Sequence, residues 1–235
     1  MTRHDDQPRL AELLRRTDAI ADGEPAADNI PTGFPTLDRL LGGGLRRGDL
    51  IVLGGDVGTG KSALALAFAL RAAEAGNAVT YLSGEMSPTR VRERILAIEG
   101  RASIDSLRSG TVDEETRASL GAVALRKSFT LPAIRALPPE GGIAFLAEIQ
   151  VAPEPVLLVV DSLQHVHGMG TPAENNAQAV LALKELAMRN HVAVLVTAHL
   201  PELPPNRENL RPLLHDFGAV GAIKQLADVV LGLFR

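Results

Sequence analysis

A glycine-rich run that ends in Lys-Ser leaves this chain few folds to choose from. The run has the pattern G-x-x-x-x-G-K-[ST], which is matched by Gly55, Asp56, Val57, Gly58, Thr59, Gly60, Lys61 and Ser62. An apolar run at Leu50 to Leu53 predicts a buried strand before it, and Ser62 to Glu74, apolar nearly all round, predicts a buried helix after it. We therefore expect a strand–loop–helix unit of an α/β fold.

The residue types of this loop indicate triphosphate binding. Glycines let the backbone turn so that successive N–H groups face an anion, and the helix that begins near Lys61 directs its positive end to the same place. Lys61 supplies a mobile positive charge for the β- and γ-phosphates, and the Ser62 hydroxyl is a suitable ligand for Mg²⁺. We predict that the whole loop binds ATP together with Mg²⁺.

A strand that ends in aspartate supplies a second group for holding the Mg²⁺. Residues 156–161 are apolar except for the final Asp161. Many strands end in aspartate merely as a turn residue, so this pattern is weak by itself. A phosphate loop, however, needs a carboxylate at the carboxyl end of a neighbouring strand. We predict that Ser62 and, through water, Asp161 hold the Mg²⁺.

Two further side chains lie just beyond predicted strands. Glu85 follows the strand at 78–83, where a carboxylate could orient and deprotonate the attacking water. The alternative is an exposed acid that complements the dipole of the next helix. His199 ends the strand at 192–198 and is either a sensor of the γ-phosphate or an ordinary histidine at a strand end. From spacing alone both alternatives stay open.

The rest of the sequence alternates strand and helix patterns. Further strands are expected at residues 78–83, 129–134, 155–161, 192–198 and 229–234. Helices are expected at residues 87–99, 113–127, 139–151, 171–190 and 217–227, with a loop at 201–215. Ser87-Pro88 and Thr171 to Glu174 are start signals, and Gly100 is a stop signal. This order predicts a mostly parallel, twisted sheet with helices on both faces.

The first 29 residues differ in pattern from the rest and are expected to be an appendage to one domain at 30–235. Leu10, Leu13 and Leu14 have helical spacing beside charged residues, which predicts a short amphipathic helix. Residues 23–29 are typical of a linker. The helix is either a frayed terminus or an element that docks on a neighbouring subunit, and the sequence favours neither.

Composition excludes several classes of function. Cysteine is absent, which excludes disulfides, thiolate catalysis and cysteine-ligated metal sites. His165 and His167 have no third ligand nearby, so two packed or solvent-facing histidines are expected. The net charge of −4 and the 3% of aromatic residues argue against a broadly basic surface or a base-stacking platform. Any contact with nucleic acid has to come from a local groove or a ring of subunits.

Targeting signals are not evident in the sequence. No apolar signal core follows the charged start, and the longest apolar run, Ala63 to Leu70, is far shorter than a membrane span. We expect a cytoplasmic protein without a membrane partner.

The chain resembles the RecA-like P-loop ATPase superfamily, and most closely the C-terminal motor domain of DnaB-type replicative helicases. Beside the phosphate loop, the resemblance rests on residues 30–38 (IPTGFPTLD) with 45–50, 83–87 (SGEMS), 161–164 (DSLQ), and 211–216 with 221–230 (GAIKQLADVV). The last pair is the most specific, since the generic ATPase fold does not need it. The resemblance covers about residues 30–235 and implies a RecA-like core.

The resemblance also implies roles. Glu85 matches the catalytic glutamate, and His199 falls where the family places a polar γ-phosphate sensor, usually glutamine. The loops at 168–176 and 201–215 fall where the family faces single-stranded DNA. Arg207 and Arg211 become candidate phosphate contacts, with a solvated surface loop as the alternative. The family implies Mg²⁺-dependent ATP hydrolysis coupled to movement of single-stranded DNA in a homo-oligomeric ring, with a hexamer as one option. The N-terminal helix resembles the family's linker helix.

Some features depart from the family pattern. The late arginine that acts on a neighbour's ATP falls beyond Arg235, which puts a trans-acting arginine in doubt. The family's N-terminal scaffold domain is a second feature that we do not expect here. Residues 41–45 (LGGGL) are closer to the RadA and KaiC branch. The alternative function is therefore a regulatory or loading ATPase that binds ATP and an unidentified protein partner without unwinding DNA.

Overall fold

Six strands form one sheet in which every neighbouring pair runs parallel, in the order β5-β4-β6-β7-β3-β8. The computed structural model describes residues 14, 15, 17, 18, 21, 28–127, 130–140, 142–149, 156–200, 207 and 209–235. The six strands are β3 (Leu50–Gly55), β4 (Val79–Ser83), β5 (Ala133–Ala136), β6 (Leu157–Asp161), β7 (Ala193–His199) and β8 (Val229–Leu233). Two short strands, β1 (Asn29–Ile30) and β2 (Leu45–Arg46), pair antiparallel as a separate small sheet.

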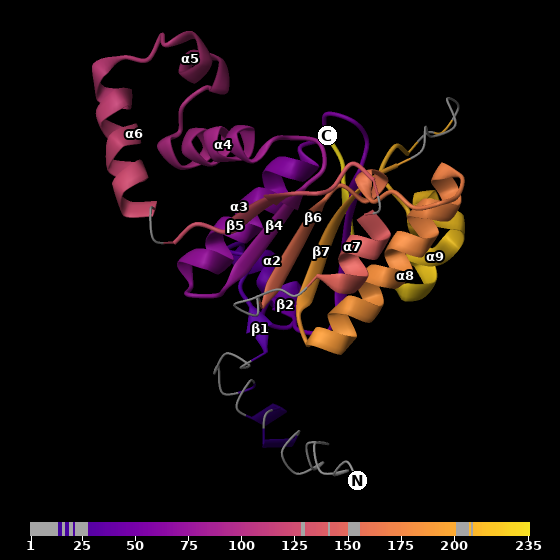
Figure 1. Cartoon of the computed structure of the whole chain (residues 1–235). Helices are drawn as coiled ribbons and strands as arrows, with labels where there is room; N and C mark the ends of the chain where they lie inside the picture. The colour runs from indigo at the N-terminus through magenta and orange to yellow at the C-terminus, as the bar shows by residue number, and fades with distance from the viewer. Residues whose placement is uncertain are drawn as a thin grey trace.

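Helices cover both faces of the sheet. They are α2 (Pro35–Leu40), α3 (Lys61–Glu74), α4 (Pro88–Gly100), α5 (Ile104–Ser109), α6 (Glu114–Lys127), α7 (Gly142–Glu148), α8 (Pro172–Asn190) and α9 (Ala222–Leu226). Further 3₁₀ turns lie at Leu163–His165, Leu214–Asp216 and Ala219–Gly221. In Figure 1, α7, α8 and α9 lie on one face and α3 on the other, whereas α5 and α6 stand away from the sheet. None of the helices in the described part of the chain combines the length and hydropathy of a membrane span.

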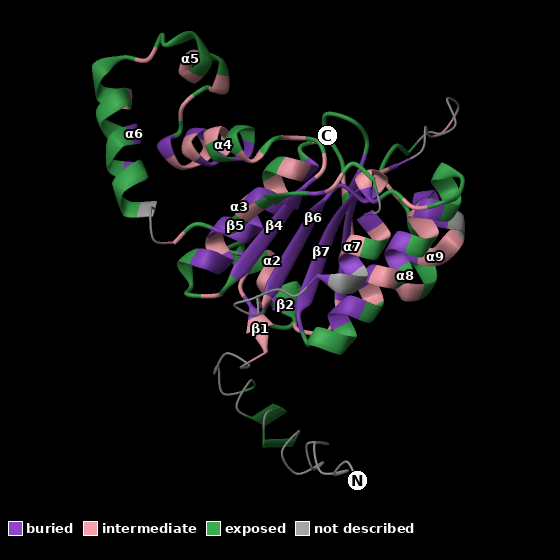
Figure 2. Cartoon of the chain, viewed as in Figure 1, coloured by how far each residue is buried: buried purple, intermediate pink, exposed green. Residues whose placement is uncertain are grey.

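Successive side chains of the central strands pack alternately in two separate hydrophobic cores, one on each face of the sheet. Leu50 and Val52 of β3 pack in the core that includes α8, and Ile51 and Leu53 pack in the core that includes α3. All four are at most 1% exposed. Because both faces are covered, these strands are almost continuously apolar rather than alternating, and Figure 2 shows them buried along their length.

The expected α/β architecture is present, with differences at the boundaries. The Ser87 hydroxyl caps α4, and Thr171 with Glu174 forms the predicted capping box of α8. Gly100 is not the stop signal, because α4 includes it and the left-handed residue is Arg101, with φ 52°. The strand expected at 129–134 is β5, Ala133–Ala136, with residue 129 outside the described part.

Several short elements of the structure were not predicted from the sequence. The β1–β2 pair, α2 and α5 are too short to show a period, and the last is only 6 residues long. The helix expected at 217–227 is divided into a 3₁₀ turn and α9. The helix expected at 139–151 is α7 alone, with residues 141, 150 and 151 outside the described part. The amphipathic helix expected at residues 10–16 lies outside the described residues except for Leu14 and Arg15, and so do residues 201–206 and 208 of the loop.

Candidate functional site

The carboxyl ends of four neighbouring strands bring the predicted site residues together. Gly55 at the end of β3 pairs with His199 at the end of β7, and Ser83 at the end of β4 pairs with Asp161 at the end of β6. Glu85 follows β4 by two residues. The carboxyl edge of an open parallel sheet is where α/β proteins bind ligands. The residues selected from the sequence therefore share the edge at which such a site is expected.

Asp56 accepts two hydrogen bonds within the phosphate loop. Its carboxylate accepts one from the backbone N–H of Val57 at 2.7 Å, and its backbone carbonyl accepts one from the Thr59 hydroxyl at 2.8 Å. Gly58 and Gly60 have φ values of 78° and 96°, in the left-handed region where side chains are unfavourable. Two of the motif's glycines are therefore required by the turn that leads into α3.

Lys61 is the first residue of α3, and its side chain folds back over the loop. Its Nζ donates to the carbonyl of Gly55 at 3.0 Å and to that of Asp56 at 2.7 Å. The residue is only 6% exposed. Burial lowers the pKa of Lys61, and the nearby carboxylates, Glu85 first, oppose that effect. The ammonium group is thus held at the mouth of the loop by two acceptors of the loop itself.

Asp161 lies buried, at 1% exposure, where the predicted metal-side group should be. The Ser62 hydroxyl donates to its Oδ1 at 3.1 Å, so the two predicted metal ligands are in direct contact. Two further hydroxyls reach the same carboxylate: Thr197 donates to Oδ1 at 2.6 Å and Tyr81 to Oδ2 at 2.7 Å. Burial raises the pKa of Tyr81 well above its usual value, and the charge of Asp161 adds to this effect.

The donor set fits Mg²⁺. The ion prefers oxygen ligands and, beside nucleotides, is usually held by one or two protein groups with waters and phosphate oxygens. A hydroxyl next to a carboxylate is such a pair. The described residues contain no cluster of three or more His, Asp or Glu side chains that could enclose an ion, and a nucleotide-associated Mg²⁺ needs none.

Glu85 and His199 meet across the site. His199 Nε2 lies 2.9 Å from Glu85 Oε1, and the Ser162 hydroxyl donates to the same oxygen at 3.4 Å. The two side chains are 34% and 30% exposed, so water reaches them. Burial raises the pKa of Glu85, but the hydrogen bond and charge of His199, with smaller contributions from His165 and Ser162, outweigh it and hold the pKa below its usual value.

The segment after β6 supports this pair and was not assigned a role from the sequence. Gln164 accepts a hydrogen bond from the backbone N–H of His199 at 3.1 Å, and Nδ1 of His165 lies 3.0 Å from the Ser162 hydroxyl. His165 is therefore a packed residue next to the site, as one of the two expectations for it had it. The sequence signals for these contacts were a polar run directly after an apolar strand and the 161–164 stretch (DSLQ) on which the family resemblance rests in part.

The two arginines proposed for DNA contact differ in their surroundings. Arg207 donates from Nη1 to Asp216 Oδ1 at 2.6 Å and from Nη2 to the carbonyl of Arg211 at 2.9 Å. Its side chain is 15% exposed, so the guanidinium group is engaged in holding this segment. Arg211 is exposed.

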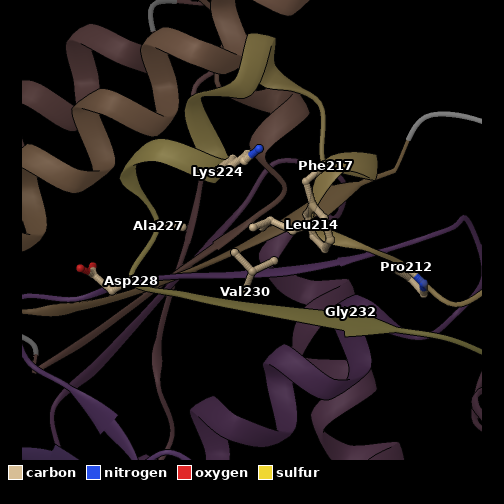
Figure 3. A pocket seen from close by; sticks show the side chains of 8 residues that line it. All are labelled: Pro212, Leu214, Phe217, Lys224, Ala227, Asp228, Val230 and Gly232. Atoms are coloured by element: carbon tan, nitrogen blue, oxygen red, sulfur yellow. The ribbon is translucent and has the colours of Figure 1, made fainter.

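A pocket of about 340 Å³ lies along the edge strand β8. It is lined by Pro212, Leu214, Phe217, Lys224, Ala227, Asp228, Val230 and Gly232 (Figure 3). Apolar side chains gather in its middle, and the Asp228 carboxylate at one end is bonded to Lys184 and to the backbone N–H of Leu50. None of the residues predicted to bind nucleotide lines this pocket. The pocket is therefore separate from the candidate nucleotide site at the strand ends.

The parallel sheet, the phosphate loop and the strand-end carboxylates define a RecA-like P-loop NTPase core. The chain belongs to the family described as DnaB-like helicase C terminal domain, whose model matches residues 29–235. The resemblance and the fold class predicted from the sequence are thereby confirmed.

Curated relatives include replicative helicases. The chain is 32% identical over 244 residues to replicative DNA helicase DnaB of Geobacillus stearothermophilus, covering 95% of this chain and 50% of that protein. It is 30% identical over 226 residues to replicative DNA helicase DnaC of Bacillus subtilis (strain 168), covering 88% and 47%. DNA repair protein RadA of Mycobacterium tuberculosis is 30% identical over 175 residues, which is 72% of this chain and 31% of RadA. The chain thus spans about half the length of the two helicases.

Solved structures share the fold. A DnaB-like replicative helicase, described with its interactions with primase, has a TM-score of 0.81 at 21% identity, covering 96% of this chain and 56% of that chain. A second solved structure, described as an ATPase domain, has a TM-score of 0.79 at 22% identity, covering 96% and 83%. At these identities the likeness speaks for the fold alone.

Proposed function

We propose that this chain is the motor domain of a DnaB-type DNA helicase, which hydrolyses ATP and couples hydrolysis to single-stranded DNA in a homo-oligomeric ring. The observation that carries the proposal is the meeting, at one sheet edge, of the Lys61 ammonium, the Ser62–Asp161 pair and the Glu85 carboxylate. These are the parts that phosphoryl transfer requires: a cradle, a metal-side pair and a group that orients water. Residues 1–29 are proposed as the appendage and 30–235 as the ATPase domain.

Each residue of the site has a role in this proposal. Residues 55–62 bind the triphosphate through backbone N–H groups, and Lys61 exchanges its two carbonyl acceptors for phosphate oxygens. Ser62 and Asp161 would hold Mg²⁺, which, when bound, neutralises charge on the β- and γ-phosphates. A cytoplasmic location accords with this function.

Glu85 is proposed as the general base. Its carboxylate orients a water molecule and takes a proton from it as the new oxygen–phosphorus bond forms and the bond to the β-phosphate oxygen breaks. His199, whose Nε2 lies 2.9 Å from Glu85 Oε1, is proposed as the sensor of the γ-phosphate. A base has to be ionised. A glutamate is charged at neutral pH, and the lowered pKa of Glu85 extends the charged state to a lower pH.

The test separates binding from turnover. We expect Glu85→Gln to retain ATP binding but to lose at least about 100-fold in turnover, the usual contribution of a general base. Lys61→Ala should instead abolish binding, because it removes the charge that pairs with the phosphates. Labelled-nucleotide titration and steady-state phosphate release measure the two effects. Glu93→Gln on α4, whose carboxylate pairs with Arg108, is the matched control, and equal turnover in Glu85→Gln and the unchanged protein would contradict the role.

A second candidate function is a RadA- or KaiC-like ATPase that acts with a protein partner and does not unwind DNA. The match to RadA over 72% of the chain and the engagement of Arg207 by Asp216 favour it. The two functions differ in whether single-stranded DNA stimulates the ATPase.

A further inference from the structure

Asp161 is held from both sides by hydroxyls that belong to no nucleotide-binding motif. Tyr81 comes from β4 and Thr197 from β7, the two strands that flank β6 in the sheet. Tyr81 and Thr197 are both 0% exposed. A buried hydroxyl without a partner costs free energy, so each of these two side chains depends on the carboxylate, and the carboxylate depends on them.

The strand register explains why both hydroxyls reach the same group. Tyr81 pairs with Val159 and lies with it in the core that faces α3, so its ring points along the face on which Asp161 follows two residues later. Thr197 stands two residues beyond Leu195, which belongs to the same core. The three side chains thus lie on one face of neighbouring strands, under the start of α3.

These contacts fix the orientation of the carboxylate. Oδ2 accepts from Tyr81 and Oδ1 accepts from Thr197 and Ser62, so a rotation of the carboxylate would break short bonds on both oxygens. Because Ser62 donates its single proton to Asp161, the lone pairs of its oxygen stay free for a cation.

We propose that Tyr81 and Thr197 are positioning residues of the divalent-cation site: they hold Asp161 in the orientation that binds Ser62 and the cation's water. The inference rests on the proposed function, because it assumes that Ser62 and Asp161 serve a cation bound with nucleotide. Groups that orient ligands from behind typically contribute about 10–100-fold to metal affinity. A purely structural role would lower stability and leave cation affinity unchanged.

The experiment measures cation affinity directly. Mn²⁺, a paramagnetic substitute for Mg²⁺, is titrated into the full chain with saturating ADP, and free Mn²⁺ is followed by electron paramagnetic resonance. We expect Tyr81→Phe and Thr197→Val each to weaken Mn²⁺ binding about tenfold. ADP affinity measured in EDTA should change less than about twofold, because the loop itself is untouched.

Two further variants separate the hydroxyl from the packing. Thr197→Ser keeps the hydroxyl and should bind Mn²⁺ as tightly as the unchanged protein. This comparison tests the hydroxyl even if Thr197→Val lowers the stability of the protein. Thr80→Val removes a buried hydroxyl from the opposite face of β4 and should leave the affinity for Mn²⁺ unchanged. Unchanged Mn²⁺ affinity in Tyr81→Phe and Thr197→Val, or equal weakening by Thr197→Ser and Thr197→Val, would overturn the inference. If the unchanged protein bound no nucleotide, the proposed function would fail instead.

Discussion

At the scale of single residues, the site keeps its charges in contact with partners. Lys61 is bonded to two carbonyls, Asp161 to three hydroxyls and Glu85 to a histidine and a serine. Charged groups that are partly or fully buried need such partners, because desolvation otherwise favours their neutral forms. The arrangement brings one ammonium group and two carboxylates close together at the sheet edge.

The pH dependence of turnover follows from the contacts of Glu85. Its pKa is lowered, so the Glu85 carboxylate stays charged to a lower pH than an ordinary glutamate does. His199→Ala removes the main donor and leaves burial, which raises the pKa. We therefore expect the acidic limb of the kcat–pH profile to move to higher pH in this variant. His199→Gln retains a donor and should move the limb less.

This profile is measured by phosphate release over the pH range in which circular dichroism finds each variant folded. A limb that stayed in place, or moved to lower pH, in His199→Ala would show that the histidine does not set the protonation of Glu85.

At the scale of elements, the sheet is packed so closely that single glycines matter. Gly54 of β3 lies under the ring of Phe217, where an added Cβ would stand 2.1 Å from Cε1 of that ring. Phe217 follows the 3₁₀ turn in which Asp216 binds Arg207 and the backbone of Leu213. The close approach thus joins the strand before the phosphate loop to the residues that directly follow the loop at 201–215, which is proposed to face DNA.

We expect Gly54→Ala to lower the free energy of unfolding by about 2–3 kcal/mol, because the extra methyl group overpacks this contact. Gly121→Ala is the matched control: Gly121 is exposed within α6 and its added Cβ would meet nothing within 4 Å. The free energy of unfolding of that variant should rise by about 0.5–1 kcal/mol, because alanine has a higher helix propensity than glycine. Urea unfolding measures both changes, and a Gly54→Ala protein as stable as the parent would contradict the packing argument.

At the scale of the whole molecule, the surface is not that of a broadly basic DNA-binding protein. The net charge is −4, so an interaction with DNA has to be assembled locally or by several subunits. Arg211 is exposed, whereas Arg207 is engaged with Asp216. We therefore propose Arg211, rather than Arg207, as the candidate DNA contact of this segment.

The helicase proposal predicts that single-stranded DNA stimulates the ATPase and that added salt weakens the stimulation, because phosphate contacts release counter-ions. Arg211→Ala should reduce the stimulation, whereas Arg108→Ala, an exposed arginine on α5, should not. Sedimentation with a non-hydrolysable ATP analogue should reveal a ring. A persistent monomer without any DNA effect would favour the partner-dependent ATPase.

The sequence by itself determined the local chemistry of this protein. The spacing of the phosphate loop, the apolar strand that ends in Asp161 and the capping box at Thr171 are signals within a few residues, and each depends on backbone geometry that neighbours in the chain enforce. The strand–helix alternation likewise predicts a parallel sheet with two covered faces, because parallel strands need crossover helices.

Only the tertiary structure decided which partners surround those groups. Tyr81 reaches Asp161 across 80 positions of the sequence, and Thr197 across 36. Such contacts depend on strand order and register, which no local pattern encodes, and the same holds for the pairing of Arg207 with Asp216. Parallel strands bring distant residues to one edge of the sheet. The motifs therefore identify the charged groups of the site, whereas only the fold identifies the residues that orient them.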